Sequence, residues 1–208
     1  MNKLSAIHME QEDRLLLYQL FWHYYHGDLI KVTAIDWANL GELLRTITVL
    51  SESELGNQAI CIFDEVSEES LQTFGFDYNR LFVGPNRLLA SPYESTYSNV
   101  EGNIMQQETI KVRNFYHYEG LQVAEEGQFP DDHIQYELEF ICYLLNQNEK
   151  ESDLNLFLEN HFFKWVNKHC ERVEEHSQNR LTLAFAYLLK EFLQLEKIII
   201  EGGEPNVN

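Results

Sequence analysis

Residues that could bind or catalyse are concentrated in one short stretch, which holds Asp131, Asp132, His133 and Glu137. On a helix, His133 and Glu137 would lie one turn apart and could face each other. Three interpretations follow: a corner whose carboxylates bind guanidinium groups, a helix cap with a side-chain pair, and an acid/base pair. Because no nucleophile or metal motif accompanies the cluster, we rank binding first, the structural cap second and catalysis last.

Other candidates for chemistry are weaker. His23 and His26 are three residues apart, and His161 and His169 are eight apart, but neither pair has the further ligands that a metal site needs. The GxSxG, Walker A and GxGxxG patterns are absent from the sequence. We therefore predict no catalytic residue, no metal ligand and no cofactor.

Helical periodicity dominates the segments that must position the cluster. Pro130, Asp131 and Asp132 are interpreted as the start of the helix that carries it, because Pro is tolerated in a first turn and Asp caps free N–H groups. The best short strand candidate, 59–63, has no partner strand. The predicted fold class is therefore all-α, a helical bundle. Apolar spacings of three and four predict the other helices over 14–25, 36–50, 65–74, 107–118, 154–169 and 180–199.

Residues 76–100 differ in composition from the helical segments. Gly84, Pro85 and Pro92 interrupt this stretch, and aromatic residues lie between them. Glycine and proline residues that interrupt a stretch in this way are typical of an ordered connecting segment. At this length we expect one domain over 1–208, and a hinge between two subdomains would fall near 93–107.

The chain is strongly acidic. It has 15 Lys and Arg against 34 Asp and Glu, which gives a net charge of −19 at pH 7. This balance argues against nucleic-acid binding and against docking on anionic lipid. No apolar run approaches the roughly 20 residues of a membrane helix, and residues 1–11 contain no signal-peptide core. Together with three widely spaced cysteines, these features predict a cytoplasmic protein without stable membrane insertion.

Two long stretches contain no basic residue, one between Arg45 and Arg80 and one between Arg113 and Lys150. The acidic surface expected there has two interpretations. It either keeps the protein soluble or attracts a cationic peptide. The charge pattern alone leaves both open.

Three runs of residues, in fixed order, resemble the TorD/DmsD family of cytoplasmic chaperones for molybdenum-containing oxidoreductases. The similarity covers about 78–165, and the family often has Trp where this chain has Tyr93. The runs are Leu81-Phe82-Val83-Gly84-Pro85, Ala90-Ser91-Pro92-Tyr93-Glu94-Ser95 with Tyr97, and Pro130-Asp131-Asp132-His133-Ile134 with Glu137 and Glu139.

The resemblance implies an all-helical chaperone that is not an enzyme. Its partners would be the catalytic subunit of a molybdoenzyme and the twin-arginine leader peptide of that subunit. Such a chaperone binds the leader and the apo-enzyme, aids cofactor insertion and holds back export until maturation. We expect a monomer or a helix-exchanged dimer. The alternative is a metal-dependent or acid/base hydrolase that uses His133 and Glu137.

The resemblance also implies a peptide-binding surface, to which the cluster above adds Glu137. Phe82 and Pro92 could equally hold the connecting segment in place. A receptor for two guanidinium groups and an apolar stretch needs carboxylates beside an aromatic groove. The acidic 119–139 region and the aromatic 93–97 segment would supply both if they lie together. The expected surface consists of Phe82, Pro92, Tyr93, Tyr97, Pro130, Asp132, His133 and Glu137.

Overall fold

The computed structural model describes residues 9–98, 103–124, 126–127, 129–147 and 149–202. In these residues, helices are joined by loops that contain only isolated β-bridges, so the all-α prediction is confirmed. No helix in the described ranges is both long enough and apolar enough to cross a membrane.

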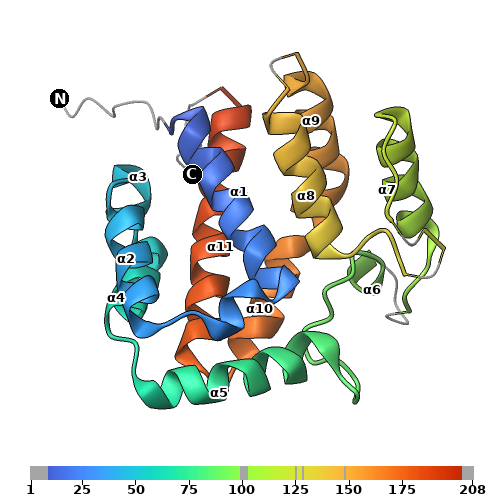
Figure 1. Cartoon of the computed structure of the whole chain (residues 1–208). Coiled ribbons are helices and arrows are strands. Elements are labelled where there is room, and N and C mark those ends of the chain that lie inside the picture. The colour runs from blue at the N-terminus through green and yellow to red at the C-terminus, as the bar shows by residue number, and fades with distance from the viewer. Residues whose placement is uncertain (1–8, 99–102, 125, 128, 148, 203–208) are drawn as a thin grey trace.

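The helical elements are named as in Figure 1. In chain order they are α1 (Gln11–His26), η1 (Asp28–Lys31), α2 (Ala34–Arg45), α3 (Thr48–Ser51), α4 (Glu54–Asp64), α5 (Glu68–Tyr78), η2 (Asn79–Val83), α6 (Ser95–Ser98), α7 (Gln107–Tyr118), α8 (Ile134–Leu145), α9 (Glu151–Phe157), η3 (Leu158–Phe162), α10 (Phe163–His176) and α11 (Arg180–Ile200).

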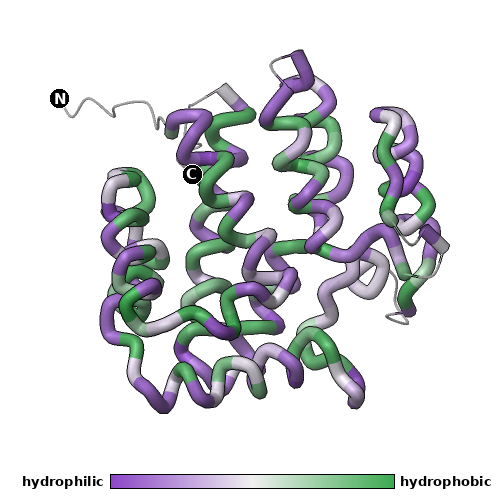
Figure 2. Tube along the Cα trace, viewed as in Figure 1, coloured by the Kyte–Doolittle hydropathy of each residue, from purple (hydrophilic) through white to green (hydrophobic). Residues whose placement is uncertain are grey.

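The core is organised around α11. This helix packs against α4 and α10, while α1 crosses it and packs against α8. In Figure 1, α2 to α4 lie on one side of this centre, α8 and α9 lie on the other, and α7 lies at the far edge. The rings of Tyr24 in α1 and Phe185 in α11 stack with centroids 3.9 Å apart. Figure 2 shows hydrophobic and hydrophilic residues alternating along the helices, as expected where each helix buries one face.

A buried ion pair also joins α1 to α11. Nη2 of Arg14 lies 2.6 Å from Oε1 of Glu196, and the Tyr18 hydroxyl donates to the same oxygen at 3.1 Å. Glu196 is fully buried. A buried carboxylate needs such partners because burial removes its hydration.

Two helix predictions match the structure closely. The helix expected over 107–118 is α7, and Gly120 follows it in the left-handed region with φ of 75°. The helix expected over 180–199 is α11, which begins after Asn179 accepts a hydrogen bond from the backbone N–H of Leu181. Both ends depend on capping signals that are local in the sequence.

Other boundaries were predicted wrongly. The single helix expected over 36–50 is divided into α2 and α3 by a turn at residues 46 and 47. The turn is closed by the Thr46 hydroxyl, which donates to the Leu43 carbonyl at 2.7 Å. Residues 59–63 belong to helix α4, whose first turn is capped by the Ser53 hydroxyl. The strand candidate is therefore excluded.

The helix expected over 65–74 was expected to stop at Gly75, but α5 begins at Glu68 and continues to Tyr78. A Cβ on Gly75 would lie 3.0 Å from Cγ2 of Ile30, so the glycine provides room for close packing rather than a stop. The helix expected over 154–169 is part of a longer helical run, α9 to α10, that includes the π-helical segment η3. The hinge near 93–107 stays a prediction, since residues 99–102 lie outside the described ranges.

Candidate functional site

The two motif segments that carry the resemblance meet in space. Tyr93 and His133 form an isolated antiparallel bridge, in which the Glu94 N–H donates to the Asp132 carbonyl at 3.0 Å and the Ile134 N–H donates to the Pro92 carbonyl at 2.8 Å. The rings of Tyr93 and His133 lie edge to face, with centroids 4.9 Å apart. The expected proximity of the acidic and aromatic segments is confirmed.

The Asp132 carboxylate is fully buried and has two partners within the protein. Its Oδ2 accepts from the Ser95 backbone N–H at 2.8 Å, and its Oδ1 accepts from the Thr109 hydroxyl at 2.8 Å. Asp131 is also fully buried, and its Oδ2 accepts from Nη2 of Arg113 at 2.6 Å. In this geometry both carboxylates hold the corner together rather than present oxygens to a ligand.

The start of α8 differs from the sequence prediction. The N-cap is His133, whose Nδ1 accepts from the Gln135 backbone N–H at 3.1 Å, and the helix begins at Ile134. The two aspartates do not cap the helix because their oxygens bond to α6 and α7 instead. Burial lowers the pKa of His133 to about 4, so the imidazole is neutral at pH 7 and Nδ1 is free to accept.

Glu137 and His133 have different partners. The Glu137 carboxylate is fully buried, and its Oε2 accepts from the Trp165 indole N–H at 3.2 Å. Burial, together with the nearby carboxylates of Glu94 and Asp132, raises the pKa of Glu137 well above its usual value. Within the described residues, no group of three or more His, Cys, Asp or Glu side chains could hold a metal ion. The geometry thus gives the hydrolase alternative no support.

The apolar residues of the expected surface lie mainly inside the molecule. Phe82 is buried against Tyr25 and Tyr78, with ring centroids 5.5 and 5.1 Å away. Pro92 and Pro130 are buried as well. These side chains hold the connecting segment against the helices, while Tyr93 remains half-buried beside His133.

A hydrogen-bond network anchors the same segment through Tyr97. The Tyr97 hydroxyl donates to the Ser91 carbonyl at 2.8 Å, and its ring stacks on Trp165 at 5.4 Å. Nδ1 of His169 lies 3.0 Å from the same carbonyl, which can only accept, so this nitrogen carries the proton. Nε2 of His169 then accepts from the Tyr25 hydroxyl at 2.8 Å. Burial lowers the pKa of His169 to about 3 and keeps the ring neutral.

A pocket that the sequence analysis did not identify lies beside the Tyr93–His133 bridge. The two are connected by Tyr136, whose ring centroid is 5.9 Å from that of His133 and which lines the pocket. The cavity measures about 350 Å³. Its lining residues are Tyr116, Leu121, Gln122, Val123, Ala124, Tyr136, Glu139, Phe140 and Tyr143.

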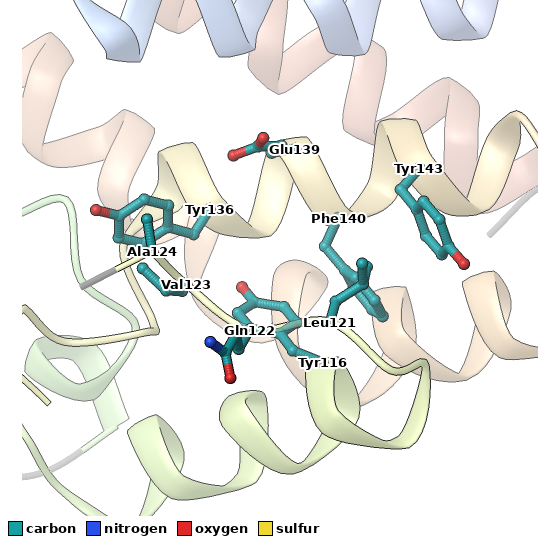
Figure 3. Close-up of a pocket in the computed structure, with 9 residues that line it drawn as sticks. All are labelled: Tyr116, Leu121, Gln122, Val123, Ala124, Tyr136, Glu139, Phe140 and Tyr143. Carbon is teal, nitrogen blue, oxygen red and sulfur yellow. The ribbon is translucent and has the colours of Figure 1, made fainter. Parts of the chain in front are cut away.

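Among its described lining residues, this pocket combines aromatic rings with the carboxylate of Glu139. Figure 3 shows Phe140 pointing from α8 toward Leu121, with Tyr136 and Tyr143 on either side and the carboxylate of Glu139 directed away from Leu121. Glu139 is exposed and forms no hydrogen bond or ion pair within the described part of the chain. No Lys or Arg lines the pocket.

The spacing along α8 is the signal that could have revealed this pocket. Tyr136, Phe140 and Tyr143 recur at four and three residues, which places them on one side of a helix. Ile134, Leu138, Ile141 and Leu145 form a second apolar row, which is buried in the core. A helix with two apolar rows needs two partners, and here the row of Tyr136, Phe140 and Tyr143 faces the loop after α7.

The architecture has a counterpart among solved structures. It is similar to the crystal structure of a “Putative Redox Enzyme Maturation Protein” from Archaeoglobus fulgidus, with a TM-score of 0.54, 22% identity and coverage of 93% of this chain and 99% of that one. At this identity the similarity shows the fold alone.

The family is shown by the sequence. The family model described as “Nitrate reductase delta subunit” matches residues 37–171, and the chain therefore belongs to this family. It is 27% identical over 130 residues to the “Probable Tat proofreading chaperone DmsD” of Haemophilus influenzae, covering 62% of this chain and 63% of that protein. It is 29% identical over 138 residues to the “Chaperone protein TorD” of Shewanella oneidensis, covering 64% and 63%. The TorD/DmsD resemblance is confirmed, and the matches span just under two thirds of these relatives.

Proposed function

We propose that this protein is a cytoplasmic chaperone, rather than an enzyme, for a molybdenum-containing oxidoreductase. It binds the twin-arginine leader and the apo form of the catalytic subunit, aids cofactor insertion and holds back export until maturation is complete. Membership of the family and the relatives named as TorD and DmsD chaperones support this role.

One observation carries the proposal for the leader. The bridge between Tyr93 and His133 lies next to the ring-lined pocket, which we call the leader pocket. Glu139 lines this pocket, and its carboxylate has no partner among the described residues. A twin-arginine leader presents guanidinium groups followed by apolar side chains. The pocket offers a partner for each part, since carboxylates bind guanidinium groups and rings accept both cations and apolar groups.

The proposed roles of the other residues follow from their positions. Tyr93, His133 and Tyr136 would form the surface that contacts the leader beside the pocket. Asp132 would act as a positioning residue, because its buried carboxylate holds the backbone of Ser95 in place. The arrangement predicts that loss of Asp132 weakens leader binding through the shape of the corner.

A peptide titration tests the proposal. A synthetic twin-arginine peptide should bind more tightly than its twin-lysine counterpart, because Lys cannot form bidentate contacts, and affinity should fall with salt. We expect Glu139→Gln to weaken binding by about fivefold, since a partly exposed charge-assisted contact contributes on the order of 1 kcal/mol. Glu42→Gln removes an exposed carboxylate of α2 and serves as the matched control.

The outcome that contradicts the proposal is equally plain. Equal affinity for the two peptides, with no dependence on salt, would remove the carboxylate from the binding mechanism. If Glu139→Gln and Glu42→Gln weaken peptide binding equally, the loss comes from the change in net charge alone. That result would exclude the leader pocket as the binding site.

A further inference from the structure

A second groove lies on another side of α7, and its character is opposite to that of the leader pocket. It measures about 590 Å³ and is bounded by α6, α7 and the run from η3 to α10. Its walls carry Lys111, Lys164 and Lys168, with the rings of Tyr97 and Phe115 between them. We call it the lysine groove. Three lysines in one groove are notable in a chain whose net charge is −19.

The two acidic residues of the groove have partners within it. Oε2 of Glu94 lies 2.8 Å from Nδ1 of His161, and both side chains are buried. Oε1 of Glu108 lies 3.6 Å from Nζ of Lys111. The remaining lysines, Lys164 and Lys168, are exposed and have no hydrogen bond or ion pair within the described ranges. Two of the three lysines of the groove therefore have no carboxylate partner in the described part of the chain.

The placement of these charges is unusual for this molecule. Most basic side chains in the described part of the chain form ion pairs, for example those of Arg45, Lys150 and Lys190. Lys164 and Lys168 are instead followed one turn later by Arg172, so that like charges repeat along one side of α10. Like charges spaced four apart destabilise a helix slightly, and no ion pair among the described residues offsets this cost at Lys164 and Lys168.

We propose that the lysine groove binds an extended acidic segment of a partner protein. Four residues of α-helix rise about 6 Å, and alternate residues of an extended strand lie about 7 Å apart. Carboxylates at alternate positions of an extended segment therefore match the spacing of Lys164 and Lys168. Tyr97 and Phe115 provide apolar contact for the segment between its charges, and Asn160 provides an amide.

The occupant differs from the leader in charge and in place. Helix α7 contributes Tyr116 to the leader pocket but Lys111 and Phe115 to the lysine groove. A cationic leader and an acidic segment would therefore occupy separate sites at the same time. This inference goes beyond leader binding and stands independently of it.

A labelled peptide tests the inference on the full chain. The probe is a short synthetic peptide with Glu at alternate positions, compared by fluorescence anisotropy with the same peptide carrying Gln. We expect the Glu peptide to bind more tightly at low salt, and Lys164→Glu with Lys168→Glu to weaken its binding by about tenfold or more. Lys31→Glu with Arg180→Glu makes the same change in net charge at exposed positions elsewhere, and we expect less than about a twofold effect.

Three results would overturn the inference. One is an equal loss of binding in the two double variants, which would show an effect of net charge alone. Another is equal affinity for the Glu and Gln peptides. The third is displacement of the Glu peptide by inorganic phosphate beyond the effect of chloride at the same ionic strength, which would assign the groove to phosphate. Binding of the twin-arginine peptide should be unchanged in Lys164→Glu with Lys168→Glu, so the two proposals can fail separately.

Discussion

Substitution of Asp132 by Asn distinguishes a residue that holds the corner from one that contacts the leader. The two oxygens of Asp132 accept from different elements, one from the Ser95 N–H and one from the Thr109 hydroxyl. An Asn side chain keeps its shape but has only one acceptor oxygen. The amide oxygen can still accept from the Ser95 N–H and the NH2 group can donate to the Thr109 hydroxyl, but both hydrogen bonds lose the assistance of a charge.

The magnitude follows from these two changes. A hydrogen bond to a charged group contributes roughly 1 kcal/mol more than a neutral one, and two such bonds are weakened here. We expect Asp132→Asn to lower the free energy of unfolding by about 2 kcal/mol, or the melting temperature by about 4–8 °C in a domain of this size.

Urea unfolding followed by circular dichroism measures this loss, and a double-mutant cycle locates it. Thr109→Val removes one donor to the same carboxylate, so the two substitutions together should cost less than the sum of their separate effects. Ser98→Ala changes an exposed residue at the end of α6 and serves as a control for effects on the neighbouring turn.

The result that refutes this reasoning is a stable Asp132→Asn protein with impaired leader binding. Unchanged unfolding energy together with weakened affinity would mean that the carboxylate is available to the ligand. Strictly additive effects of Asp132→Asn and Thr109→Val would likewise show that the hydrogen bond between them contributes nothing.

Further predictions concern the core. Above pH 4.5 Glu137 loses its proton in the unfolded chain but retains it in the folded protein, where its pKa is raised. This group therefore makes the free energy of unfolding fall as pH rises. Glu137→Gln should flatten that fall in urea unfolding measured between about pH 5 and about pH 8. Glu196→Gln leaves the buried guanidinium of Arg14 without its counter-charge and should lower the unfolding energy by about 3 kcal/mol, whereas an effect below about 1 kcal/mol would contradict the buried pairing. Gly56→Ala would drive its Cβ into the carbonyl of Leu50 and should lower the melting temperature by several degrees, and an unchanged value would refute the close contact.

The helices that the sequence predicted well are those whose ends carry local signals. Helix α7 is followed by Gly120, and α11 is preceded by Asn179. Gly75 misled the prediction because its small size serves contact with Ile30, a residue far away in the chain. A glycine needed for packing and a glycine that ends a helix are indistinguishable in a single sequence.

The candidate site shows the same limit. The resemblance selected the segments of Tyr93 and His133, and the structure brings them together. The partners of Asp131 and Asp132, however, lie on α6 and α7, so the capping role inferred from their position next to α8 was wrong. The sequence identified Glu139 only as part of the motif that carries the resemblance. Its spacing does not reveal that Leu121 lies beside the same helix and forms a pocket with it.

The contact between α1 and α11 determines when the protein can finish folding. Arg14 and Glu196 are separated by 182 positions, yet they meet at the centre of the molecule. During synthesis, Tyr18 and Phe21 leave the ribosome long before Phe192 of α11, which packs against both rings, so the nascent chain carries an open apolar surface until α11 is made. A chain whose translation stops before α11 would keep this apolar surface exposed and would be degraded by proteases. Synthesis of α11 is therefore required before the protein can fold.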